Sequence, residues 1–332
     1  MTKKLSYRFW LLALLILLPL MVIVHVLSGQ ISLNFSDIVS AFNSYDATNT
    51  NHIIFFEFRI PRMTMAILSG SALAVSGMLM QTLFNNPLAG PYVLGINSGA
   101  SLIVALTLLT GIPFFTSDFG LISGALFGAL LFGSIILFFS FYIRSHISLL
   151  LIGLMISSFV GAIITTLESM SAAEQLKSYT FWSFGSLQQT ALNQLPLITI
   201  GCFVGFLGSF LLIKPLNAML LGETSAKSLG IHIRSFRIWV IGITAILTGT
   251  ITAFCGPIAF VGLAIPNLTR MLFQTQNHQY LLFGNLLIGG IFMLICDTII
   301  QLVEPYFVLP INAFTSLIGA PFVVYIVLKN LI

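Results

Sequence analysis

The sequence predicts an all-α protein that crosses a membrane about ten times as a single domain over residues 1–332, and two observations support this. Hydrophobic residues make up 58% of the chain and charged residues 7%, with a mean hydropathy of +1.05. Because charged residues usually make up about 25% of a water-soluble domain, this composition is typical of a chain whose solvent is lipid. Apolar runs of roughly 20 residues also recur along the chain, the length that a helix needs to cross a bilayer core about 30 Å thick.

Breaks formed by Gly, Pro, Asn and charged residues separate these runs. The predicted spans cover residues 9–28, 61–82, 92–111, 119–142, 147–167, 192–213, 236–254, 257–273, 281–302 and 309–328. The first run is longer than the apolar core of a typical signal peptide and lacks a clear small-x-small cleavage site, so we expect it to remain as the first helix. Residues 168–190 are only partly apolar and are expected to form a short helix at the outer surface.

Small residues within the runs are expected to pack the helices together. Gly70, Gly77 and Gly128 are examples, and small residues let helix backbones approach closely in lipid. The three cysteines, Cys202, Cys255 and Cys296, lie singly in apolar runs without metal-like spacing, so we interpret them as core residues and expect no metal site.

The distribution of basic residues orients the chain. With both termini in the cytoplasm, only Arg59, Arg62 and Lys177 of the 13 Lys and Arg residues fall outside, as the positive-inside rule favours. The remaining ten, 13 minus 3, are Lys3, Lys4, Arg8, Arg144, Lys214, Lys227, Arg234, Arg237, Arg270 and Lys329. The net charge of +4 therefore reflects cytoplasmic loops next to membrane lipid, and we expect no nucleic-acid partner.

No pattern in the sequence indicates an enzyme. The chain lacks the G-x-x-x-x-G-K-[ST] string of a nucleotide-binding loop, so any ATP chemistry would belong to another chain. We expect no cofactor on this chain.

Two arginines at the outer end of the second span oppose the positive-inside trend. Arg59 and Arg62 stand three residues apart, and we expect an acidic partner for them. The alternative is that they snorkel to the interface or pair with Glu57.

Several polar residues interrupt the apolar pattern elsewhere. Asn86 lies in the turn Asn85-Asn86-Pro87, where side-chain amides can satisfy free backbone groups. Asn267 follows Pro266 in a segment whose Gly and Pro content predicts an interrupted helix. Asp297 lies within the ninth run, and an intramembrane carboxylate is a functional candidate unless a neighbouring donor neutralises it.

The most polar loop, residues 214–234, is expected to hold a short amphipathic helix on the cytoplasmic side. Glu223 can begin this helix and Gly230 can end it. Leu220, Leu221 and Leu229 would then be available to a groove on a cytoplasmic partner, or to lipid headgroups.

Together these stretches resemble the permease family of iron-siderophore, heme and cobalamin ABC importers over nearly the whole chain. The matching residues are Gln81, Asn86, Pro87, Leu88, Ala89, Pro91, Leu94 and Gly95; Gly222, Ala226, Leu229 and Gly230; 260–263; and 318–322. The resemblance implies the type II importer fold of ten helices. It also implies a second permease subunit, identical or different, two cytoplasmic ATPase subunits and an extracytoplasmic binding lipoprotein.

The resemblance also implies roles for individual residues. Arg59 and Arg62 would meet glutamates of the binding protein. The loop containing Leu220, Leu221, Gly222, Glu223, Ala226, Leu229 and Gly230 would be the coupling helix that fits a groove of the ATPase. Three positions depart from the family pattern: Asn267 replaces His, Gln301 replaces a basic residue, and Asn312 replaces Gly.

We therefore expect the permease half of an importer of iron-siderophore complexes. Its pathway would lie along the fifth and tenth helices, with Met155, Ser158, Thr165 and Thr315 as lining residues. The alternatives are heme or cobalamin uptake by the same machinery, an ion-coupled secondary transporter that uses carboxylates such as Asp297, and a purely structural membrane subunit.

Overall fold

The computed structural model describes residues 7–31, 33–92, 95–111, 118–143 and 145–331, and within them the regular structure is helical. The helices are α1 (Tyr7–Leu27), α2 (Phe35–Asn43), α3 (Thr50–Ile53), α4 (Ile60–Leu83), α5 (Ile96–Thr110), α6 (Asp118–Tyr142), α7 (His146–Met170), α8 (Ala173–Phe184), α9 (Leu195–Leu211), α10 (Ile213–Met219), α11 (Glu223–Ser228), α12 (Ile233–Cys255), α13 (Val261–Phe273), α14 (His278–Val303) and α15 (Ile311–Leu331). A π-helical turn, η1 (Ile54–Arg59), joins α3 to α4, and the 3₁₀ turn η3 (Leu192–Gln194) precedes α9.

Each predicted apolar run coincides with a helix in the described part of the chain. Among the described residues, seven helical segments are long and apolar enough to cross a membrane, and α5, α13 and α15 are shorter apolar helices. Whether these three cross the whole bilayer stays a prediction. The expected short outer helix within residues 168–190 is α8.

The predicted first residues of two helices were wrong by about four positions, a usual error for helix boundaries predicted from sequence. The span expected from residue 92 begins at Ile96, after Gly95 with a φ of 75°. The span expected from residue 257 begins at Val261, because Gly256 ends α12 and Phe260, with a φ of 65°, cannot continue a right-handed helix.

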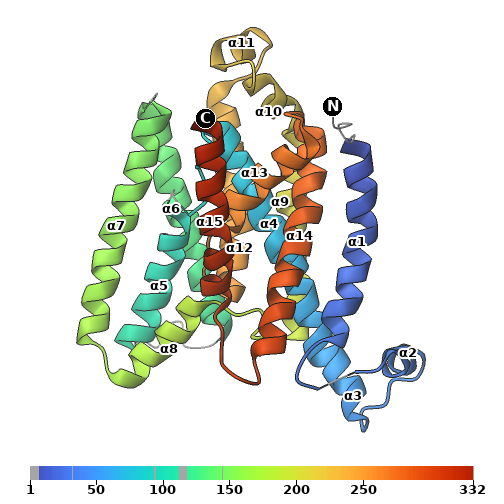
Figure 1. The fold of residues 1–332 in the computed structure, drawn as a ribbon. Coiled ribbons are helices and arrows are strands. Elements are labelled where there is room, and N and C mark those ends of the chain that lie inside the picture. Colours follow the sequence, from blue (N-terminus) through green and yellow to red (C-terminus); the bar gives the residue numbers. More distant parts are fainter. Residues whose placement is uncertain (1–6, 32, 93–94, 112–117, 144, 332) are drawn as a thin grey trace.

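Helix α4 forms the centre of the bundle and packs against α14, α12, α13 and α9. Figure 1 shows α7 at one edge of the molecule and α1 at the opposite edge. The start of α1 and the end of α15 lie at the same end of the bundle as α11, whereas α2, α3 and α8 lie at the other end (Figure 1).

Glycine contacts bring the central helices together, as the sequence predicted. A Cβ atom on Gly70 would overlap the carbonyl group of Gly289 in α14, and one on Gly77 would overlap the carbonyl group of Gly262 in α13. Gly128 meets Gly99 in the same way. These contacts allow the backbone-to-backbone packing on which helix association in lipid depends.

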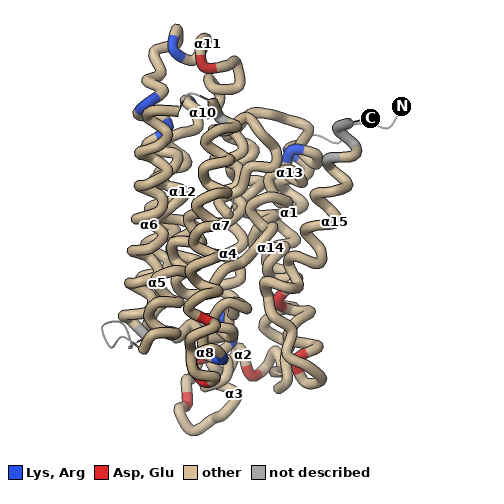
Figure 2. The backbone as a smooth tube through the Cα atoms, turned by 90° about the vertical axis from the view of Figure 1, so that its left-hand side faces the viewer, with Lys and Arg blue, Asp and Glu red and all other residues tan. Residues whose placement is uncertain are grey.

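The charges divide between the two ends of the bundle (Figure 2). Lys and Arg gather near α11 and the neighbouring ends of α12 and α13, while most acidic residues lie at the opposite end near α2, α3 and α8. The positive-inside rule therefore assigns the α11 end to the cytoplasm. Lys3, Lys4 and Arg144 lie outside the described residues, as does the side chain of Lys329.

Candidate functional site

The outer end of the bundle contains a buried polar cluster centred on Asp297 of α14. Its carboxylate accepts hydrogen bonds from Arg62 Nε at 2.7 Å and Arg62 Nη2 at 3.0 Å. His25 Nε2 of α1 lies 2.7 Å from the same carboxylate, and Gln301 Nε2 donates to it at 3.0 Å. Asp297 is only 2% exposed, so this carboxylate joins α1, α4 and α14 inside the protein.

Arg59 extends the cluster toward the outer surface. One Nη donates to the side-chain oxygen of Gln301, and the other donates to the backbone oxygen of Ile31 at 2.9 Å. Glu304 lies 3.3 Å from Arg62 Nη1 and is more exposed than Asp297. Arg59, Arg62, Gln301 and Glu304 line a cavity of about 410 Å³ at this end.

The prediction of an acidic partner for the arginines is confirmed for Arg62, which pairs with Asp297 and Glu304. The alternatives were wrong, because Glu57 is exposed and both arginines are buried, at 7% and 9% exposed, instead of snorkelling to the interface. A neighbouring donor does neutralise Asp297, as one interpretation of that residue expected. Contact of Arg59 and Arg62 with a binding protein stays a prediction.

Sequence reasoning did not single out His25. The sequence did contain a signal for this residue: it is an ionisable side chain within the otherwise apolar first run. In a membrane helix, such a side chain usually has a buried polar partner. It was missed because nothing in the sequence indicates that residues 25 and 297 are neighbours. Gln301 had been noted only as a departure from the family pattern, and in the structure its amide links Arg59 to Asp297.

At the cytoplasmic end, amide side chains fix the turn that contains Asn86. The Asn86 side-chain oxygen accepts from Leu88 N at 2.9 Å, and Asn267 Nδ2 donates to Pro87 O at 2.9 Å. Arg270 donates to the side-chain oxygen of Gln81. A cavity of about 380 Å³ lies beside this turn, lined by Asn86, Asn267, Arg270 and Gln81 and also by Met219 and Leu220. Asn267 therefore fastens the turn to α13.

The third departure, Asn312, also has a structural contact. Its side-chain oxygen accepts a hydrogen bond from the backbone N–H of Ala259 at 3.1 Å. This bond satisfies one donor of the irregular segment between α12 and α13, where the helical pattern of hydrogen bonds is interrupted.

The polar loop projects beyond the bundle at the same end, as Figure 1 shows for α10 and α11. Helix α11 begins at Glu223, and Gly222 and Gly230 on either side have φ angles of 91° and 83°. Leu220, Leu221 and Leu229 are 46%, 66% and 63% exposed, while Ala226 is buried. A short helix is therefore present in this loop as expected, and the three exposed leucines flank it: Leu220 and Leu221 precede it and Leu229 follows it.

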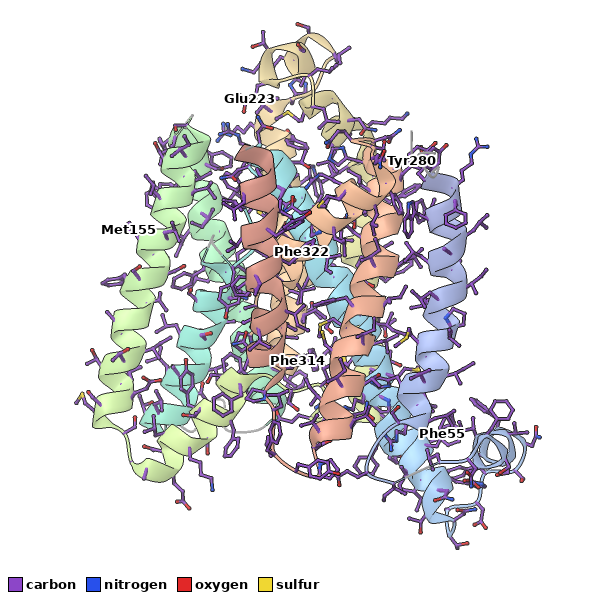
Figure 3. All side chains as sticks on the ribbon, viewed as in Figure 1. Phe55, Met155, Glu223, Tyr280, Phe314 and Phe322 are labelled. Carbon is purple, nitrogen blue, oxygen red and sulfur yellow. The ribbon has the colours of Figure 1, made fainter. Side chains whose placement is uncertain are left out.

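An ion pair fixes the start of α11 to the bundle. Arg237 of α12 donates to Glu223 Oε1 at 2.9 Å and to the backbone oxygens of Ser140 and Ile143 at 2.9 and 3.3 Å. Figure 3 labels Glu223 at the base of the projecting loop. A force on α11 can thus reach both α12 and the end of α6.

The structure separates the four residues expected along the pathway. Met155, Ser158 and Thr165 are exposed on α7, and Figure 3 shows Met155 pointing away from the bundle. Thr315 of α15 is fully buried, and its hydroxyl donates to Asn312 O at 3.2 Å. Thr315 does not line an open surface in this conformation, because the side of α15 on which it lies is packed against the bundle.

Comparisons with known proteins agree with this architecture. Residues 14–329 match the model of the FecCD transport family. The hemin transport system permease protein HmuU of Yersinia pestis is 34% identical over 340 residues, which cover 99% of this chain and 98% of that protein. The iron-uptake system permease protein FeuB of Bacillus subtilis is 31% identical and covers 94% of this chain and 93% of its own length. The molybdate import system permease protein MolB of Haemophilus influenzae is 36% identical over 81% of this chain and 79% of its own length.

A solved metal-chelate type ABC transporter in an inward-facing conformation has a TM-score of 0.84 and 30% sequence identity, and the match covers 97% of this chain and 99% of that one. The full-length matches exclude an ion-coupled secondary transporter and a purely structural subunit, and they indicate a transport permease, which is not itself an enzyme. The chain belongs to the FecCD transport family, as a multi-pass permease subunit of an ABC importer of the metal-chelate type in the cell membrane.

Proposed function

We propose that this permease carries an iron-siderophore complex across the cytoplasmic membrane, driven by a separate ATPase. The observation that carries the proposal is the exposed side of α7. Between Ile147 and Leu167 this helix contains no charged residue, and its exposed side combines apolar groups with hydroxyls. Such a surface suits a large ligand whose metal charge is enclosed by its own chelating groups.

Three hydroxyls on this side are already hydrogen-bonded within their own helix. Ser158 donates to Leu154 O at 2.9 Å, Thr166 donates to Ala162 O at 2.8 Å, and Ser169 donates to Thr166 O at 2.8 Å. Because its hydrogen is already donated, each of these three hydroxyls offers a ligand only its acceptor lone pairs. The face therefore provides weak contacts, which allow a ligand to pass without being retained.

The uncharged exposed side of α7 disfavours a small oxyanion as the ligand. One relative is named as a molybdate importer, and a compact dianion needs charged or N–H donors to replace its hydration. The exposed middle of α7 offers none of these. Hemin is the second candidate, because the relative named for hemin transport matches almost the full length of both chains. Cobalamin is a further large chelate that the same face could accommodate.

We propose that α11 with its flanking residues, Leu220 to Gly230, is the coupling element that docks on the ATPase. The three exposed leucines and the ion pair between Glu223 and Arg237 support this role. A second permease subunit, identical or different, would cover α7 and complete the pathway, and two ATPase subunits would bind at the cytoplasmic end.

We propose further that the binding lipoprotein docks at the outer end, near Arg59 and Arg62. Both guanidinium groups border the outer cavity. Glu304 is the more exposed carboxylate on Arg62, so an acidic side chain of the binding protein can replace it more easily than Asp297.

Uptake of radiolabelled ligands by cells that express this permease with its ATPase and binding protein tests the proposal. Iron-siderophore complexes, hemin, cobalamin and molybdate are supplied separately, and each is also used as an unlabelled competitor. We expect uptake of an iron-siderophore complex that is lost in the Gly222→Val and Glu223→Gln variants at normal membrane abundance. Uptake of hemin, cobalamin or molybdate instead would refute the proposed substrate class, and unchanged uptake in both variants would refute the coupling role.

A further inference from the structure

Helix α2 carries an apolar surface that the transport machinery does not explain. Phe35, Val39 and Phe42 are 64%, 43% and 67% exposed. Their spacing of four and three residues places them on one side of the helix. Exposed aromatic side chains grouped in this way mark an interaction surface rather than a random part of the exterior.

The other sides of α2 have different environments. Ala41 is buried and Ile38 partly buried, and both belong to a small apolar cluster with Phe55. Ser36 and Asn43 are exposed on the polar side. At 100° per residue, the exposed apolar stripe lies between the packed edge and the polar side, so one edge of α2 is attached to the protein while the stripe remains uncovered.

Side-chain contacts hold α2 in a fixed orientation. Asp37 accepts a hydrogen bond from the backbone N–H of Asn34 at 3.0 Å, at the start of the helix. Ser40 is hydrogen-bonded to His52 of α3 at 3.0 Å, and the ring of Phe42 packs edge-on against the ring of Phe55 at 5.3 Å. The apolar stripe is therefore presented by a rigid element.

The position of α2 in the bundle indicates what covers this stripe. Figure 1 shows α2 projecting sideways beyond α1, at the edge of the molecule opposite α7. Helix α1 itself exposes apolar side chains along its length, among them Leu12, Ile16, Leu20 and Ile23. Helix α2 therefore lies at the same edge of the molecule as the exposed apolar side of α1, and away from α7, which is expected to face the pathway and the second permease (Figure 1).

We propose that α2 is an interfacial anchor that rests in the headgroup region of the outer leaflet, with Phe35, Val39 and Phe42 inserted toward the acyl chains. Amphipathic helices that lie on a membrane often carry Phe on their apolar side, and they bury that side at the boundary between headgroups and acyl chains. The sequence has no Lys or Arg between Arg8 and Arg59, whereas it has Asp37 and Asp46. The attachment is therefore apolar and does not require anionic lipid.

Spin labelling of the complete permease–ATPase complex in lipid nanodiscs tests this anchor. Single cysteines replace Phe35 and Val39 on the stripe, Ser36 and Asn43 on the polar side, and Ile16 on α1 as a lipid-facing reference. The native cysteines are free and buried, and the parent chain reports any background labelling. Power saturation then compares the accessibility of each label to oxygen, which concentrates in lipid, and to a water-soluble nickel chelate.

We expect the ratio of oxygen to nickel accessibility to be several-fold higher at positions 35 and 39 than at 36 and 43, and close to that at position 16. The ratio should be the same in phosphatidylcholine alone and in mixtures with phosphatidylglycerol. Nickel access at all four positions of α2 would overturn the proposal by placing the helix in water. Labels at 35 and 39 that are shielded from both reagents would also overturn it, because a protein would then cover the stripe.

Discussion

The buried carboxylate of Asp297 provides the sharpest test of the outer polar cluster. Replacing Asp297 with Asn keeps the side-chain shape but removes the charge that neutralises Arg62. It also replaces one of the two acceptor oxygens with an NH₂ donor. In the native protein, two guanidinium N–H groups of Arg62 and the amide of Gln301 donate to these oxygens. The variant therefore leaves a buried cation poorly paired.

The expected cost follows from the burial of the pair. Removing one partner of a buried ion pair usually costs about 3–5 kcal/mol. Glu304 remains 3.3 Å from Arg62 in the variant, so we take the lower end, about 3 kcal/mol of unfolding free energy. The matched control is Glu304→Gln, which removes a more exposed carboxylate from the same guanidinium and should cost about 1 kcal/mol or less.

Unfolding of the purified permease in mixed micelles with increasing SDS measures both costs, and circular dichroism follows the loss of helix. A double variant in which Arg62→Gln accompanies Asp297→Asn should be less destabilised than the sum of the two single variants, because the two buried charges that neutralise each other are then removed together and only the more exposed Glu304 loses a partner. The reasoning would be refuted if Asp297→Asn were no more costly than Glu304→Gln, or if the effects of the two single variants simply added.

Three further variants test the packing, the coupling loop and the pathway. Gly77→Val should prevent the accumulation of folded protein in membranes, because even a Cβ atom at this position overlaps the backbone of α13. The control variant Gly242→Ala should accumulate normally, because a Cβ atom there meets no neighbouring atom. Immunoblots of membrane fractions measure the abundance of both variants. Gly222→Val forces a β-branched residue to a φ of 91° and a ψ of 158°, a backbone region nearly restricted to glycine, and this strain costs about 1–3 kcal/mol. Since the loop is exposed, we expect normal abundance of this variant in membranes and strongly reduced ligand uptake. Normal uptake would contradict the coupling role. Ser158→Trp should leave abundance unchanged because the side chain is exposed, yet reduce uptake by narrowing the pathway; equal uptake in this variant would place the pathway elsewhere.

Much of the architecture could be predicted from the sequence because each helix must satisfy its own backbone in lipid. An apolar run of sufficient length leaves the chain few alternatives to a helix, so the ten runs were located within a few residues. The errors fell at Gly95 and Phe260, where local backbone conformation and not hydropathy sets the helix start. The short helix from Glu223 was predictable for a similar local reason, since glycines bound it on both sides.

The candidate site was less predictable because its partners are distant in the sequence. Arg62 and Asp297 are separated by 235 residues, and His25 and Asp297 by 272. The sequence indicated that each ionisable residue needs a partner in lipid, but not which helices lie side by side. Thr315 shows the same limit, since the side of α15 that packs inward depends on its neighbours.

The sequence by itself thus determined the membrane class, the approximate spans, the orientation favoured by its basic residues and the position of the cytoplasmic loop. All of these depend on whether a local stretch of residues is more stable in lipid or in water. Only the tertiary structure decided that the outer arginines turn inward to Asp297 and Gln301, that Asn267 fastens a turn to α13, and that α2 is left with an uncovered apolar stripe. Those outcomes depend on which glycine contacts bring α4 against α13 and α14. Such contacts are selected by the fit between whole helix surfaces, a property that no single segment contains.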